Sequence, residues 1–348
     1  MKVVGLIDVV RYGILVLMIS LSGHLLAAST EVSKGTVSGG KISEHPDWFK
    51  ESFLEIADDV DEAAEAGRHV MLFMHLNGCP YCYKTLEENI KNSPYTDFIK
   101  KNFDVIAINI QGDREIAFND EVTLKEKELA EMLNVRFTPT ILFLNGDNQL
   151  VLRLNGYRTR SAFKHALDFV KQKAYEQTTL TQYIEHQSAE RPYHFRDHPQ
   201  LQRLTNLQSV ADKPLALLFE DKWCEEACNA LHDKNLNLPE TRKILNNFTF
   251  VRLDASSNTP IIDVEGNQTT AKAYAEKLGI SYRPGIVMFD RGREILRIDG
   301  MLYSFHFQEN LRYVGERGYE RYNNDHQKYM QDRTQEVLAS GRNIDISK

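Results

Sequence analysis

The sequence repeats itself once, at an offset of 145 residues, and this repeat limits the possible folds more than any other feature. Cys79 aligns with Cys224 and Pro139 aligns with Pro284, so each cysteine lies 60 residues before its proline. Further along, one deletion changes the offset to 144, and apolar positions and a glycine continue to align: Gly156 with Gly300, Phe163 with Phe307, Leu167 with Leu311, and Val170 with Val314. The series predicts a tandem duplication of one domain.

Within the first copy, short apolar runs alternate with helical patterns. The apolar runs predict strands at residues 70–74, 103–108, 140–144 and 150–154. Helical spacing of apolar residues predicts helices at about 46–64, from 79 onward, at 124–133 and at 161–175. Strands that alternate with helices are typical of an α/β layer fold. The first strand run has its counterpart in the second copy at residues 215–219.

Length and composition are those of a globular protein with two cores. The 348 residues leave room for two domains of ordinary size after a leader, and 42% of the residues are hydrophobic. The chain has 42 Lys and Arg against 49 Asp and Glu, a net charge of −7, and no run rich in Lys or Arg. We therefore expect no nucleic-acid partner, because such proteins present a basic patch to the phosphates.

The first 29 residues have the pattern of a signal peptide. Lys2 and Arg11 precede an apolar stretch at residues 12–22, and Ala27 and Ser29 supply small side chains at a cleavage site. The apolar stretch is shorter than the roughly 20 residues that a spanning helix needs. We therefore expect an exported protein. The alternative is an uncleaved leader that anchors the chain, in which case the protein contacts a membrane.

The cysteines form two close pairs, and the first pair, Cys79 and Cys82, has the spacing of a redox site. Unpaired N–H groups and the dipole at a helix start stabilise a thiolate at Cys79. Residues three apart on a helix have Cα atoms roughly 5 Å apart, which is within disulfide range. Cys79 can then attack a substrate disulfide and Cys82 can resolve the intermediate. An inert disulfide or half of a zinc site are the alternatives, although zinc would need two further ligands.

Two motifs carry a resemblance to a known family. Gly78-Cys-Pro-Tyr-Cys82, with Arg136-Phe-Thr-Pro-Thr140, resembles the thioredoxin superfamily and is similar to the SoxW-type periplasmic thioredoxins. The resemblance implies a central mixed sheet flanked by helices, a periplasmic location, and no cofactor beyond the redox-active disulfide. It also implies partners of two kinds, namely protein thiol or disulfide substrates and a redox partner that donates or accepts electrons.

The resemblance also assigns roles to residues near the cysteines. It implies a substrate-binding surface made by Pro80, Tyr81, Thr138 and Pro139, with a cis Thr138–Pro139 bond that faces the cysteines. An ordinary proline at a strand start is the alternative for Pro139. Many members carry a buried acid six residues before the first cysteine. Here that position is Phe73, and we interpret the nearby His75 as a packed or exposed histidine rather than a base.

The second copy resembles the same fold, through Trp223-Cys224 and Arg283-Pro284, and makes Pro284 a second cis-proline candidate. Its cysteines, Cys224 and Cys228, are one residue further apart and are separated by Glu225, Glu226 and Ala227. The two acids should raise the pKa of Cys224. We interpret the pair as a degenerate redox or structural disulfide. The alternative is a copper-type site, as in the thioredoxin-fold Sco proteins, with His232 or His306 as a further ligand.

These observations predict an α/β protein with two tandem thioredoxin-like domains. The expected segments are a signal peptide (1–29), a flexible segment (30–44), a first domain with the CPYC motif (45–176), a linker (177–197), a second domain with the CEEAC motif (198–318) and a charged helical tail (319–348). The leading hypothesis is an exported thiol–disulfide oxidoreductase of reductase or isomerase type. The alternatives are a client-binding adaptor and a metallochaperone that uses Cys224 and Cys228.

Overall fold

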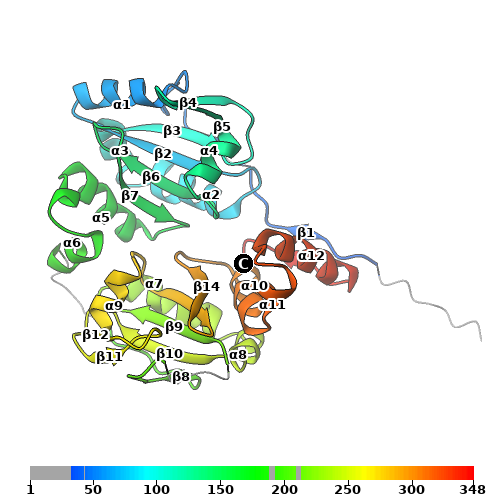
Figure 1. Cartoon of the computed structure of the whole chain (residues 1–348). Helices are drawn as coiled ribbons and strands as arrows, with labels where there is room; N and C mark the ends of the chain where they lie inside the picture. Colours follow the sequence, from blue (N-terminus) through cyan, green and yellow to red (C-terminus); the bar gives the residue numbers. More distant parts are fainter. Residues whose placement is uncertain (1–32, 43, 188–192, 209–212) are drawn as a thin grey trace, which may run out of the picture.

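The computed structural model describes residues 33–42, 44–187, 193–208 and 213–348, and Figure 1 shows two α/β domains, one above the other, with the C-terminal helices beside them. The expected signal peptide, residues 1–29, lies outside the described residues. Each domain has a central mixed sheet covered by helices, as the repeat predicted. Within the described residues, no helix is long and apolar enough to cross a membrane.

The sheet of the first domain has the strand order β3-β2-β6-β7. Strand β2 pairs in parallel with β3 and antiparallel with β6, and β6 pairs antiparallel with β7. The strands are those expected from the apolar runs, each extended by at most one residue at an end: β2 His69–His75, β3 Phe103–Asn109, β6 Thr140–Leu144 and β7 Leu150–Asn155.

Side chains alternate along these strands, so the sheet has two buried faces. Val70 and Leu72 pack on one face with helices α1 (Ile56–Glu65) and α4 (Glu126–Met132). Met71 and Phe73 pack on the other face. The elements of that second layer are α2 Pro80–Thr85, the π-helical turn η1 Leu86–Lys91, α3 Thr96–Asn102 and α5 Arg160–Lys171. The 3-10 turn η2 Ala174–Glu176 and helix α6 Leu180–Gln187 follow α5.

The first helix differs from the prediction. It begins at Ile56 rather than near residue 46, and the preceding residues are turns and irregular chain. The cause is local, because Leu54 has a φ of 66°, which no residue of a right-handed helix adopts. The apolar residues before it are therefore not one helical stripe: Phe49 packs into the core, whereas Phe53 is 97% exposed.

A short hairpin was not predicted. It is formed by β4 (Glu115–Asn119) and β5 (Val122–Lys125), which pair antiparallel. Because β5 takes the residues up to Lys125, the following helix starts at Glu126 instead of residue 124. The strands are short and only one of their residues, Ile116, is buried, so they have no apolar run that would reveal them in the sequence.

The second domain repeats the first, with one additional edge strand. Its sheet has the order β14-β13-β9-β10-β8, and the pairing of β9 with β10 and β13 matches that of β2 with β3 and β6. The strands are β8 Leu201–Gln202, β9 Leu215–Glu220, β10 Thr249–Asp254, β13 Gly285–Asp290 and β14 Arg293–Ile298, with a hairpin of β11 Pro260–Ile262 and β12 Gln268–Thr270. The helices are α7 Glu225–Ala230, η3 Leu231–Leu236, α8 Pro239–Leu245, α9 Ala271–Lys277 and α10 Ser304–Gly315.

The expected linker and tail both contain regular structure. Helix α6 lies within residues 177–197, where we expected a linker. The tail contains α11 (Gly318–Arg321), α12 (His326–Ala339) and β15 (Ile344–Asp345). Strand β15 pairs in parallel with β1 (Val37–Ser38), so the two ends of the described chain lie side by side (Figure 1).

The two domains meet through equivalent residues. Tyr157 forms an isolated bridge with Met301, its own counterpart at the 144-residue offset. The Asn155 side chain donates a hydrogen bond to its counterpart Asp299, at 3.2 Å. A contact between equivalent surfaces is what a two-fold relation between two copies produces. The duplicated domains therefore pack against each other much as the subunits of a symmetric dimer do.

Candidate redox site

The first cysteine pair lies at the start of helix α2, as predicted. Cys79 is the N-cap residue, Pro80 occupies the first turn, and Cys82 lies one turn into the helix. The two cysteines form a disulfide with Cα atoms 5.3 Å apart. Cys79 is 7% exposed and Cys82 is 0% exposed. An attacking thiol reaches only Cys79 without a rearrangement of the helix.

Hydrogen-bond donors surround the Cys79 sulfur. The backbone N–H of Cys82 donates to Cys79 Sγ at 3.1 Å, and the Thr138 hydroxyl donates to it at 3.3 Å. The carbonyl oxygen of Thr138 lies 3.6 Å from the same sulfur. The Thr138–Pro139 bond is cis, which confirms the expectation from the resemblance. Donors aimed at a sulfur stabilise its thiolate, so this environment favours the attacking form of Cys79 once the disulfide is reduced.

Tyr81, which we expected at the substrate-binding surface, lines the cleft beside Cys79 and also lies in the contact between the domains. Tyr81 is 7% exposed, and its ring stacks on Tyr303 of the second domain with centroids 4.9 Å apart. Its hydroxyl accepts a hydrogen bond from the Tyr303 backbone N–H at 3.0 Å and lies 2.9 Å from His306 Nδ1. Burial lowers the pKa of His306 to about 4. The neutral imidazole can therefore accept a hydrogen bond from the Tyr81 hydroxyl.

Beside Cys79 a cleft of about 900 Å³ opens between the first domain, strand β14 and helix α12. Cys79, Pro80 and Thr138 lie along its side in the first domain. Met301 from the second domain and Met330 from the tail line it as well. The cleft beside Cys79 is therefore lined by both domains and by the tail.

His75 is packed, as we interpreted it from the sequence. Its ring stacks on Phe73 and contacts the ring of His45 edge-on. Burial lowers the pKa of His75 to about 4, which leaves it neutral at pH 7.

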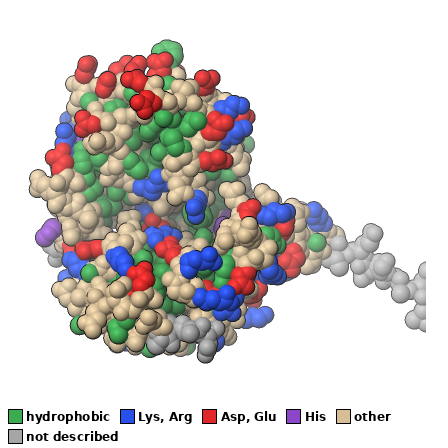
Figure 2. All heavy atoms as spheres, in the orientation of Figure 1, with side chains coloured by type: hydrophobic (Ala, Val, Ile, Leu, Met, Phe, Trp, Pro, Cys, Tyr) green, Lys and Arg blue, Asp and Glu red, His purple; other side chains and the backbone are tan. Residues whose placement is uncertain are grey.

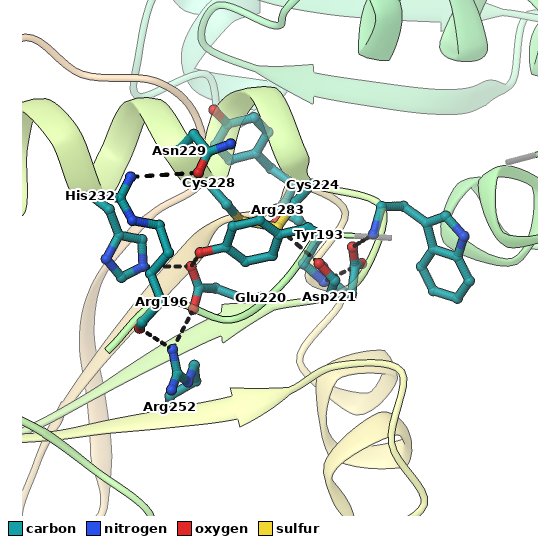
Figure 3. The surroundings of a disulfide bond; sticks show 12 residues. Tyr193, Arg196, Glu220, Asp221, Cys224, Cys228, Asn229, His232, Arg252 and Arg283 are labelled. Atoms are coloured by element: carbon teal, nitrogen blue, oxygen red, sulfur yellow. Dashed lines mark hydrogen bonds and ion pairs between the residues drawn. A yellow bond between two sulfur atoms is a disulfide. The ribbon is translucent and has the colours of Figure 1, made fainter. Parts of the chain in front are cut away.

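The second cysteine pair lies in the equivalent position but in different surroundings (Figure 3). Cys224 is the N-cap residue of α7, and its side chain accepts no capping hydrogen bond. It forms a disulfide with Cys228, with Cα atoms 5.4 Å apart. The Cys224 sulfur lies 3.0 Å from the carbonyl oxygen of Asp221, which is an acceptor. Tyr193, from the segment before the second domain, packs on both cysteines and is itself buried.

The residue aligned with Thr138 explains part of this difference. That residue is Arg283, whose peptide bond to Pro284 is also cis, as we expected for the second cis-proline candidate. The Arg283 side chain faces Asp221, with Nε 3.4 Å from Oδ2, and donates through its guanidinium to the carbonyl oxygen of Ile280. It provides no hydroxyl donor of the kind that Thr138 offers Cys79.

A buried polar network lies under the second disulfide (Figure 3), and sequence reasoning missed it. Glu220 is fully buried, and its carboxylate contacts His232 Nε2 at 2.9 Å, the Tyr193 hydroxyl at 3.1 Å and Arg252 at 3.4 Å. The available signal was an acid at the end of an apolar strand run with a histidine 12 residues later. Glu220 aligns with His75 of the first domain, so no equivalent network can form there.

The two histidines proposed as copper ligands lie in separate networks. His232 faces Glu220, and His306 faces Tyr81 of the other domain. Within the part of the chain that the structure describes, no group of three or more His, Cys, Asp and Glu side chains is arranged to hold a metal ion.

Comparison with known proteins identifies the repeated unit. Residues 56–171 and residues 204–315 each match the family model of the thioredoxin-like domain. A search of curated proteins found no match.

Solved structures similar to the chain have the thioredoxin fold. A thioredoxin-fold protein from Helicobacter pylori is 25% identical, over 34% of this chain and 84% of that chain, with a TM-score of 0.31. A thioredoxin from Thermus thermophilus is 22% identical, over 39% of this chain and 87% of that chain, with a TM-score of 0.27. The oxidised C-terminal domain of DsbD from Neisseria meningitidis is 16% identical, over 36% of this chain and 97% of that chain, with a TM-score of 0.25.

Proposed function

We propose that this chain, which belongs to the thioredoxin-like family and carries two copies of the family's domain, is a thiol–disulfide oxidoreductase that reduces or isomerises protein disulfides through Cys79 and Cys82. We assign the redox reaction to Cys79 and Cys82 because hydrogen-bond donors surround the Cys79 sulfur. Two donors, the Cys82 N–H and the Thr138 hydroxyl, lie within 3.3 Å of its sulfur. The thiolate is the attacking species in disulfide exchange, and these donors stabilise it.

The proposed reaction transfers two electrons in two exchange steps. The Cys79 thiolate attacks one sulfur of a client disulfide, which forms a mixed disulfide and releases the other client sulfur as a thiolate that takes up a proton. Cys82 then loses its proton and attacks the Cys79 sulfur. This step forms the Cys79–Cys82 disulfide and releases the second client thiol. A dithiol protein or a small thiol, itself oxidised to a disulfide, returns the two electrons, and the reaction needs no other cofactor.

For the second pair we propose a structural role. Cys224 lies beside a carbonyl oxygen, has no capping donor and is covered by Tyr193. An acceptor next to the sulfur, with no side-chain or capping donor to offset it, opposes the thiolate. This disulfide then stabilises the start of α7 above the Glu220 network.

The leader supports the proposal that the protein acts in the periplasm, where disulfides form and persist. Residues 1–29 carry the pattern of a signal peptide. N-terminal sequencing of the protein from a periplasmic fraction tests this. We expect a mature chain that starts near Thr30, whereas an intact leader in the membrane fraction would contradict the proposal.

The mechanism is tested by trapping. In a Cys82→Ser variant, Cys79 can form the mixed disulfide but nothing resolves it. We expect client proteins to accumulate on this variant and to be released by a reductant. A Cys79→Ser variant should trap none, and it is the matched control. Clients held equally by both variants, without a disulfide link, would favour the client-binding adaptor instead.

A further inference from the structure

The cleft beside Cys79 has an unbalanced charge. Apart from Cys79 and Tyr81, its ionisable lining residues are three arginines, two acids and two histidines: Arg136, Arg153, Arg297, Glu294, Asp299, His306 and His326. Each of the two acids lies next to an arginine of the protein. Glu294 accepts two hydrogen bonds from Arg297, at 2.6 and 2.7 Å. Asp299 lies 3.9 Å from the buried guanidinium of Arg158.

The two histidines add no charge at neutral pH. Burial lowers the pKa of both His306 and His326 to about 4. The remaining charge of the cleft therefore comes from Arg136 and Arg153.

These two arginines contact only uncharged groups among the described residues. Arg136 donates to the side-chain oxygen of Asn134 at 2.9 Å, and Arg153 donates to the carbonyl oxygen of Leu133 at 2.6 Å. Neither forms an ion pair within the described part of the chain. Two positive charges thus stand without a counter-ion in the cleft of a protein whose net charge is −7.

The duplication provides an internal comparison for Arg153. Its counterpart at the 144-residue offset is Arg297, which donates in the same way to the carbonyl oxygen of Leu278. Arg297 has a carboxylate partner because the second domain carries Glu294 where the first domain carries Leu150. The equivalent arginine therefore has a carboxylate partner in the second domain, whereas Arg153 has none among the described residues and lines the same cleft as Cys79. Figure 2 shows Lys and Arg side chains, with Asp and Glu side chains among them, around the hollow between the two domains.

We propose that this cleft binds an extended client segment that carries Asp or Glu near the cysteine to be reduced. The proposal rests on the function proposed above and specifies its substrate. The cleft volume of about 900 Å³ fits a short peptide segment and is too small for a folded domain. Carboxylates of the segment would pair with Arg136 and Arg153 while its sulfur meets Cys79. Electrostatic complementarity of this kind selects among partners and speeds their encounter.

Synthetic peptides test the proposal. Each peptide carries one cysteine joined to 2-mercaptoethanol by a disulfide, and the residues that flank the cysteine are Glu, Gln or Lys. We expect kcat/KM for the Glu peptide to exceed that for the Gln peptide by about tenfold at low salt, and the Lys peptide to be the poorest. High salt should reduce the difference, because it screens exposed charges.

Variants assign the preference to the two arginines. Arg136→Gln should lower the preference for the Glu peptide by about threefold, and Arg136→Lys should retain most of it. Arg153→Gln should act in the same direction. Lys101→Gln, at an exposed lysine of α3 outside the cleft, is the control and should change nothing.

The outcomes separate this proposal from the proposed function. If no peptide is reduced, the proposed function itself fails. If Glu and Gln peptides are reduced equally well, or if the Lys peptide is preferred, the enzyme is a reductase but the acidic-client proposal is wrong. A preference that survives in both Arg136→Gln and Arg153→Gln would also overturn it.

Discussion

The contact between Tyr81 and the second domain predicts a measurable loss of stability in Tyr81→Phe. The change removes one hydroxyl and keeps the ring that stacks on Tyr303. It leaves the Tyr303 backbone N–H and the His306 Nδ1 without their present partner. An unsatisfied buried group costs about 1–3 kcal/mol, so the loss of both bonds predicts a decrease of about 2–3 kcal/mol in the free energy of unfolding.

Urea unfolding of the oxidised protein measures this decrease as a lower midpoint. Tyr303→Phe is the matched control, because it removes a hydroxyl from the same pair of rings but leaves the hydrogen-bonding backbone N–H in place. We expect the control to unfold close to the wild type. Equal midpoints for Tyr81→Phe and the wild type would show that the two hydrogen bonds do not hold the domains together, and the reasoning would be refuted.

Three further changes test the packing and the buried charges. The pKa of His306 is about 4 in the folded protein and 6.5 without burial. Protonation of His306 therefore favours the unfolded chain, so the free energy of unfolding should be highest above pH 6.5 and should decrease as the pH falls towards 4. The decrease should be smaller in His306→Gln. Gly300→Ala should lower the free energy of unfolding, measured in urea, by about 1–3 kcal/mol, because the new Cβ would lie 2.7 Å from the Asn155 carbonyl oxygen. Glu220→Gln should lower the thermal midpoint by the equivalent of about 2 kcal/mol or more, because it leaves the Arg252 guanidinium buried without a carboxylate. An unchanged curve in any of these experiments would contradict the corresponding contact.

The fold was largely predictable because its signals are local or repeated. The apolar runs that predicted β2 and β6 are buried strands at the expected positions. The separation of 60 residues between each cysteine and its proline corresponds to the same pair of elements in each domain. Leu54 shows where such reasoning fails, since one residue with positive φ ends a helical pattern that apolar spacing alone extends back to residue 46.

The surroundings of the two disulfides were less predictable, because their partners are distant in the sequence. Tyr81 forms hydrogen bonds with Tyr303 and His306, which are 222 and 225 positions further along the chain. Its burial therefore depends on how the two domains pack. Tyr193 covers the second disulfide from a segment that resembles an ordinary linker. The sequence does show that Thr138 aligns with Arg283. It does not show that only the threonine directs a donor at its cysteine.

The central claim is that Cys79 and Cys82 perform the exchange while Cys224 and Cys228 support the fold. The most direct test is a disulfide-reduction assay, with insulin as substrate and a dithiol as electron donor, on Cys79→Ser and Cys224→Ser. We expect Cys79→Ser to lose most of the activity, because it removes the nucleophile. We expect Cys224→Ser to keep more than half of the activity and to unfold more readily. Equal loss of activity in the two variants would show that the second domain is a full catalytic partner and would contradict the account.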